Sequence, residues 1–306
     1  MTRAWGLIAA VVLAIAMPAC GPDAPPPAPP KKELTAAWAD IWEGTPDIYA
    51  VIRPQAIKRD QLYGTFWKNL VRIAQAKNFA GGASMLEAVE GAEEVIIGIN
   101  KGDAAMVLRG VPASHDPSKM TDASGHPLFR LVDEKAKVPE YTMFDRRTNE
   151  PGSVFVLGNR TWVGVLGESR SRARQVFASP LGRAVPEVDG EALAYVRFGT
   201  PVVTAPFFQK HPTCGPFTRR LVSVSFALKP NKAGALIALQ YKDNDGAAWG
   251  EMHAKKLVEE LSKNERLAWL KDAKVAYDND VVNVRVAVPA RLLEELPNAS
   301  GADFGF

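Results

Sequence analysis

The strongest constraint on the fold of this 306-residue chain is a set of short runs in which apolar and polar residues alternate. In Leu221–Leu228 (LVSVSFAL), the valines and the phenylalanine fall on one face and the serines on the other. Alternation with a period of two is typical of a half-buried strand. The runs Glu94–Ile99 and Ala104–Arg109 flank the polar segment Asn100–Asp103, which indicates a hairpin. The chain therefore predicts a sheet of antiparallel strands.

Helical periodicity separates these strand runs. Apolar residues recur every three or four positions in Gln61–Ala76, and a second long helical pattern covers Ala247–Trp269. Ser262 and Glu265 have the spacing of a capping box, so the second pattern can be two helices. Ser169 is placed as the N-cap of a helix that runs to Ala178.

The order of these patterns is similar in the two halves of the chain. Each half reads strand, helix, hairpin, helix, hairpin, helix, with two extra strands in the first half. We therefore expect an α+β fold of two similar lobes, each an antiparallel β-meander packed with helices, at residues 34–185 and 186–306.

The N-terminal segment carries a different signal. Arg3 precedes Gly6–Met17, which has no charged residue. A basic residue before an apolar stretch of about 7–15 residues is typical of an export signal. A membrane-spanning helix needs about 20 apolar residues, and this run is interrupted at Pro18. We expect residues 1–19 to be a signal peptide.

The end of that segment, Ala19-Cys20-Gly21, resembles the lipobox of bacterial lipoproteins. The resemblance implies that a diacylglycerol is attached to the Cys20 thiol, that the signal is cut before this residue, and that a fatty acid such as palmitate acylates the new amino terminus. Met17 stands where the family usually has leucine, and Pro18 is uncommon there. The alternative is an ordinary signal peptide with an incidental cysteine.

A proline-rich stretch follows the cysteine. Residues 21–30 (GPDAPPPAPP) contain six prolines, and such segments extend by about 3.1 Å per residue. Residues 20–33 are therefore expected to be the lipidated cysteine and a tether. By analogy with lipoprotein sorting, we expect anchoring in the outer membrane of the cell envelope, with a periplasmic or surface-exposed body.

Charge narrows the classes of partner. Lys plus Arg is 37 and Asp plus Glu is 34, a net charge of +3. This balance, together with the export signal, argues against nucleic-acid binding. Basic residues cluster at three places, interpreted as solvated surface, with contact to anionic headgroups, wall polymers or an acidic partner as the alternative. These clusters are Arg146-Arg147, Arg170/Arg172/Arg174 and Arg219-Arg220.

No known pattern of catalytic or metal-binding residues occurs. The histidines His115, His126, His211 and His253 lack metal-ligand spacing. Cys214 lies three residues after His211 among prolines and a glycine, which favours an incidental thiol over a nucleophile. There is no GxSxG, P-loop or GxGxxG motif. We therefore predict no catalytic, cofactor-binding or metal-binding residue.

Most of the tryptophans after the signal fit helical or strand core positions, so packing in the core is expected. An alternative is that they line a pocket for a lipid or another apolar ligand. Trp38 and Trp42, four residues apart on an expected N-terminal helix, could instead anchor near the membrane.

These observations favour a lipid-anchored bacterial lipoprotein whose body is a non-enzymatic binding or scaffolding module. The alternative is a carrier of lipid or another apolar ligand, and a cell-envelope hydrolase is a weaker third. Asp47–Val51 after a proline, and the strand Val284–Val286 running into Pro289, resemble exported bacterial proteins built from repeated strand-and-helix modules. That resemblance implies no particular activity.

Overall fold

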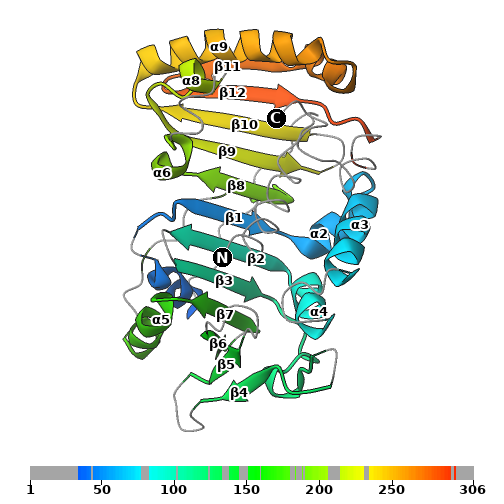
Figure 1. Cartoon of the computed structure of the whole chain (residues 1–306), viewed down its shortest axis with the longest axis vertical. Helices are drawn as coiled ribbons and strands as arrows, with labels where there is room; N and C mark the ends of the chain where they lie inside the picture. The colour runs from blue at the N-terminus through cyan, green and yellow to red at the C-terminus, as the bar shows by residue number, and fades with distance from the viewer. Residues whose placement is uncertain are drawn as a thin grey trace. The chain divides into compact units, whose positions relative to one another are not determined.

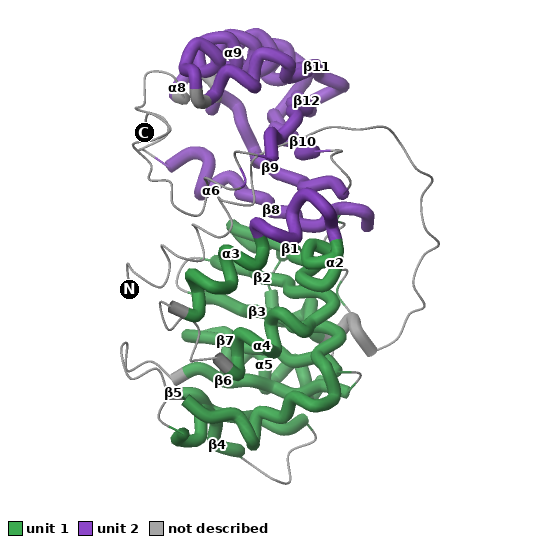
Figure 2. Tube along the Cα trace, turned by 90° about the vertical axis from the view of Figure 1, so that its right-hand side faces the viewer, with its two compact units in different colours: residues 1, 26–59, 67–188 green, residues 2–25, 60–66, 189–306 purple. Residues whose placement is uncertain are grey.

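The computed structural model describes residues 34–42, 44–76, 83–100, 103–122, 125–132, 138–144, 151–158, 160–179, 183, 188, 190–205, 214–230, 234–290 and 293. The expected signal peptide, Cys20, the tether, Arg146-Arg147 and His211 lie outside the described residues. The chain divides into two compact units (Figure 2). Unit 1 takes the described residues among 26–59 and 67–188, and unit 2 those among 60–66 and 189–306.

Unit 1 contains seven described strands, each antiparallel to its neighbours. Their spatial order is β1-β2-β3-β7-β6-β5-β4 (Figure 1). The strands are β1 (Ile48–Ile52), β2 (Glu94–Asn100), β3 (Asp103–Arg109), β4 (Phe129–Leu131), β5 (Glu140–Phe144), β6 (Pro151–Leu157) and β7 (Thr161–Leu166).

Unit 2 contains five described strands in the order β8-β9-β10-β12-β11, again antiparallel. Its last hairpin joins the unit through its second strand, β12, which pairs with β10. The hairpin β6–β7 of unit 1 likewise joins through its second strand, which pairs with β3. The strands are β8 (Ala194–Phe198), β9 (Leu221–Lys229), β10 (Gly234–Tyr241), β11 (Lys274–Asp278) and β12 (Val281–Val286).

Helices of varied length accompany the strands, so the expected α+β class with antiparallel strands is confirmed. Helix α3 contains one of the places at which the chain passes from one unit to the other, between residues 66 and 67. The helices are η1 (Leu34–Ile41), α2 (Pro54–Arg59), α3 (Tyr63–Ala76), α4 (Ala83–Gly91), η3 (Pro117–Lys119), α5 (Ser169–Ala178), α6 (Thr200–Val203), α8 (Cys214–Phe217), α9 (Asn244–Ser262) and η4 (Glu265–Asp272); those labelled η are 3₁₀ helices.

The 3₁₀ helix η1 supplies two core tryptophans to unit 1. Trp38 and Trp42 are only 2% and 3% exposed, and their rings meet edge to face with centroids 5.9 Å apart. The Trp42 ring lies so close to Gly98 of β2 that a Cβ there would overlap it. The alternative that Trp38 and Trp42 anchor the protein near a membrane is therefore wrong, because both rings are buried in the core of unit 1.

Helix α5 covers the same face of unit 1 further along the sheet. Phe177 packs on Phe155 of β6 with ring centroids 5.1 Å apart. The expected N-cap, Ser169, is instead the first residue inside the helix and is buried. Its backbone N–H donates to Oδ1 of Asp103, 3.2 Å away, at the start of β3. A hairpin that is distant in sequence thus caps this helix.

Helix α9 packs on unit 2 through small residues. Gly246, Ala247, Gly250 and Ala254 are its buried positions. A Cβ at Gly250 would overlap the Tyr241 ring of β10, so close helix-to-strand approach requires glycine there. Close packing is the reason that small residues occupy these buried positions of the helix.

The long helical pattern does divide in two, but without a capping box. Helix α9 ends at Ser262, and the 3₁₀ helix η4 begins at Glu265. The Ser262 hydroxyl donates backwards to the Glu259 carbonyl oxygen, 2.8 Å away. Ser262 therefore closes the first helix and does not cap the second.

Candidate functional site on helix α9

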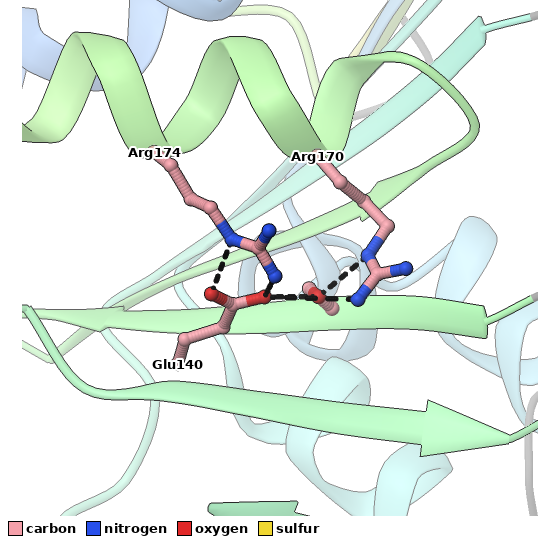
Figure 3. Close-up of polar contacts among 4 residues, drawn as sticks. Glu140, Arg170 and Arg174 are labelled. Carbon is pink, nitrogen blue, oxygen red and sulfur yellow. Dashed lines mark hydrogen bonds and ion pairs between the residues drawn. The ribbon is translucent and has the colours of Figure 1, made fainter. Parts of the chain in front are cut away.

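The arginines of α5 were the densest basic cluster in the sequence, and the structure uses them internally. Glu140 of β5 is 5% exposed, and it accepts two hydrogen bonds from Arg174, both 2.7 Å long (Figure 3). The Ser153 hydroxyl donates to the same carboxylate at 2.6 Å. Arg170 Nε donates to Ser153 Oγ at 2.9 Å, and Arg170 Nη2 lies 3.8 Å from Glu140 Oε1.

These contacts determine the charge state of Glu140. Burial acts to raise the pKa of its carboxyl, but hydrogen bonds from Arg174 and Ser153 and the two arginine charges outweigh burial and lower that pKa. The third arginine, Arg172, donates to the Ile41 carbonyl oxygen of η1. Arg170 and Arg172 are half-buried and Arg174 is exposed, so the cluster does lie at the surface, but each arginine also binds a group within unit 1.

The pair Arg219-Arg220 has a different role in unit 2. Arg220 Nη2 lies 2.8 Å from Asp243 Oδ2, and Asp243 Oδ1 accepts from the backbone N–H of Gly246 at 2.8 Å. Asp243 is thus the N-cap of α9, a position that favours an anionic side chain. Arg220 is paired with this cap, which leaves Arg219 to face the helix surface.

Trp249 of α9 is exposed but held in a defined position. Its side chain is 39% exposed, and its Nε1–H donates to the Pro216 carbonyl oxygen of α8 at 3.0 Å. The Arg219 guanidinium carbon lies 5.9 Å from the ring centroid, at cation–π distance. The His253 ring packs beside it with centroids 4.4 Å apart.

Two more side chains complete this surface. Met252 is 41% exposed and Lys256 is exposed. Trp249, Met252 and Lys256 are spaced i, i+3 and i+7, so they follow one side of the helix. We call the set Arg219, Trp249, Met252, His253 and Lys256 the α9 outer surface.

The α9 outer surface combines an imidazole of lowered pKa with two cationic side chains. Burial, followed by the positive charge of Lys256, lowers the pKa of His253, so its ring is neutral at neutral pH. The aromatic ring of Trp249 and the thioether of Met252 can pack against another molecule, and the two cations can attract a negative charge. Within the described residues, no three His, Cys, Asp or Glu side chains gather where they could hold a metal ion.

The other sequence candidates are scattered. His115 contacts Ser114, His126 Nδ1 lies 3.6 Å from Asp122, and His253 packs on Trp249. Cys214 begins the short helix α8. Sequence reasoning missed the α9 outer surface. The signal was present as Trp249 and Met252 opposite the stripe of small residues.

The structure defines an α+β protein with antiparallel strands and, on α9, an exposed surface that contains a tryptophan and a methionine. No family model matches the chain, and no curated protein matches it. Three solved crystal forms of TP0453 are similar in structure. Form I has a TM-score of 0.51 at 11% identity and covers 84% of this chain and 94% of that one. Form III has a TM-score of 0.52 at 10% identity and covers 85% of this chain and 97% of that one. Form IV has a TM-score of 0.51 at 10% identity and covers 86% of this chain and 99% of that one.

At these identities the likeness to TP0453 concerns the fold alone. It extends over most of both chains, so it includes strands and helices of each unit. Among the described residues, no helix is long and apolar enough to cross a membrane.

Proposed function

We propose that this protein is a lipid-anchored, non-enzymatic binding or scaffolding module of the bacterial cell envelope. The lipid is carried by Cys20 and residues 21–33 hold the body away from the membrane. The body faces the periplasm or the cell surface from the outer membrane. Its partner is an envelope protein that contacts the α9 outer surface.

The observation that carries the binding role is the exposure of Trp249 and Met252. Large apolar side chains that are fixed in place yet exposed are enriched where proteins bind one another. Trp249 is fixed on three sides by Pro216, Arg219 and His253. A pre-ordered ring loses little conformational entropy on binding.

We also infer that the two units arose by duplication. The order β1-β2-β3-β7-β6 in unit 1 corresponds to β8-β9-β10-β12-β11 in unit 2. In both, a hairpin is followed by a second hairpin that joins through its later strand. The strands β4 and β5, at the end of the order in unit 1, are the two additional ones.

The anchor is tested with Cys20→Ala in cells fed labelled palmitate. We expect the wild-type chain to be labelled and membrane-bound, and the variant to be unlabelled and released into soluble fractions. The matched control is Cys214→Ala, which removes the other cysteine and keeps the label. Membrane retention of Cys20→Ala, with no label on the wild type, would falsify the anchor.

The binding role is tested by placing a photo-crosslinking residue at Met252 in cells. A discrete adduct with an envelope protein is expected, and Trp249→Ala in the same chain should weaken it. The control carries the crosslinker at Lys58, an exposed residue of α2. Identical adducts from both positions would contradict a specific surface. Retained lipid in native mass spectra, without adducts, would favour the carrier instead.

A further inference from the structure

Strand β11 ends the spatial order of unit 2. It pairs with β12 on one side, and no described strand pairs with its other side. Its side chains are unusually open for a strand. Tyr277 is 43% exposed, and Lys274, Ala276 and Asp278 are also exposed. An open edge of this kind is a template for another strand.

The hairpin turn determines which backbone groups face outwards. Asn279 and Asp280 form a two-residue connection, with Asp278 directly across from Val281. The residues that flank a two-residue turn form a hydrogen-bonded pair, and such pairs alternate along an antiparallel ladder. Lys274, Ala276 and Asp278 therefore bond to β12. The backbone groups of Val275 and Tyr277 point away from it.

The sequence of this edge is complementary to itself. We infer that the edge of β11 is a docking surface for β11 of a second copy of this chain, paired antiparallel about a twofold axis at Ala276. In that register Lys274 lies opposite Asp278 of the other copy, and Val275 lies opposite Tyr277. Each cross-strand contact occurs twice. The inference goes beyond the proposed function and does not depend on it.

Charge selects this register among those that the backbone allows. Outward-facing residues must pair with outward-facing residues, so Val275 can meet Tyr277, or either can meet its own symmetry copy. Only the first arrangement places Lys274 beside Asp278. With Val275 opposite its own copy, Lys274 lies opposite Ala276. With Tyr277 opposite its own copy, Asp278 lies opposite Ala276.

On both faces of the proposed strand pair, the side chains that meet form favourable cross-strand contacts. Val275 and Tyr277 lie across from Val284 and Val282, so they share the face that α9 covers. An aromatic residue beside a β-branched one is a favourable cross-strand pair. Lys274, Ala276 and Asp278 lie on the opposite face. Opposite charges directly across strands are favourable too.

Disulfide trapping of the purified full chain tests the geometry. In the proposed register Ala276 lies opposite its own copy in a non-hydrogen-bonded pair, where Cα atoms are about 4.5 Å apart. That spacing allows a disulfide, so Ala276→Cys should form a covalent dimer under mild oxidation. Lys274→Cys is the matched control on the same strand. Its two copies would be roughly 14 Å apart at about 3.4 Å per residue, too far to bridge.

The wild-type chain, with Cys20 and Cys214 alone, gives the background. Dimer from Ala276→Cys above both controls supports the register. Equal dimer from Ala276→Cys and Lys274→Cys overturns it.

Charge reversal tests the pairing without a covalent bond. Lys274→Glu puts like charges opposite each other twice, and the dimer dissociation constant should rise about 2- to 30-fold. The double variant Lys274→Glu/Asp278→Lys reverses both pairs and should restore the wild-type constant. Sedimentation equilibrium in density-matched detergent measures each constant. Circular dichroism checks that the variants remain folded.

A monomeric wild-type chain at every accessible concentration overturns the inference. So does a dimer that is unaffected by Lys274→Glu, or one that the double variant does not restore.

Discussion

Glu140 offers a residue-scale test of the polar interior of unit 1. Glu140→Gln keeps the shape of the side chain but removes the charge that binds Arg174 and Arg170. Because hydrogen bonds to charged groups contribute about 1.5–3 kcal/mol each, we expect a loss of about 1–3 kcal/mol in the free energy of unfolding. Urea denaturation measures it. The control Glu93→Gln breaks an exposed pair with Arg160 and should change stability by less than about 0.5 kcal/mol.

The same residue predicts a pH dependence. The pKa of Glu140 is lower in the folded protein than in the unfolded chain. Its contribution is therefore complete above the unfolded pKa of about 4.3 and is lost as pH falls through the folded value. The stability difference between wild type and Glu140→Gln should shrink below about pH 4. A difference that stays constant down to pH 2 would contradict the assignment.

Gly250 predicts the cost of adding one methyl group to α9. Alanine is favoured over glycine inside a helix by about 1 kcal/mol, so Gly250→Ala would stabilise an open position. Here the new Cβ would overlap the Tyr241 ring, and overpacking costs about 1–3 kcal/mol. We expect a lower thermal midpoint. Gly158→Ala, where a Cβ would meet no atom within 4 Å, is the control. A stabilised Gly250→Ala would show that the helix can shift.

At the scale of elements, α5 depends on a distant hairpin for its start. Asp103→Ala removes the acceptor for the Ser169 N–H and should cost about 0.5–2 kcal/mol, the usual effect of losing an N-cap. Glu168 occupies the cap position but makes no capping bond, so Glu168→Ala should cost much less. Hydrogen exchange of the first turn of α5 would show the loss directly. Equal protection in both variants would speak against the long-range cap.

The strands were predictable because local alternation reports them. The run Leu221–Leu228 is β9 less one residue, and Glu94–Ile99 is β2 less one residue. Short helices were not predictable from local pattern. Helix α2 spans only six residues, too few to display a helical period. The 3₁₀ helix η3 spans only three residues and is likewise too short to display one. Helix caps were not predictable either, because a capping group can come from a residue that is distant in the sequence.

At the scale of the whole molecule, the tryptophans separate into different environments. Trp38, Trp42 and Trp162 are at most 4% exposed, whereas Trp249 is 39% exposed. Trp249→Phe should therefore reduce acrylamide quenching of the total emission and shift the remaining spectrum to the blue. Trp162→Phe is the control and should leave quenching nearly unchanged. Equal effects of the two substitutions would contradict the assignment of Trp249 to the surface.

The candidate site was less predictable than the fold. The sequence pattern placed Trp249 with the core tryptophans, whereas it is 39% exposed, and it gave no sign that Arg170, Arg172 and Arg174 bind groups within unit 1. Their positions depend on tertiary contacts. Small residues occupy the packed side of α9, so Trp249 lies outside. Arg170 bonds to Ser153, Arg174 bonds to Glu140, and Arg172 bonds to the Ile41 carbonyl oxygen.

The way each later hairpin joins its unit has a kinetic consequence. Hairpins β2–β3, β6–β7 and β11–β12 close over short turns, which takes microseconds. The pairings β3 with β7 and β10 with β12 require long intervening chain to loop back, and loop closure of that kind slows folding. Preformed hairpins should therefore dock late. Substitutions at the β3–β7 and β10–β12 seams are expected to speed unfolding more than they slow folding.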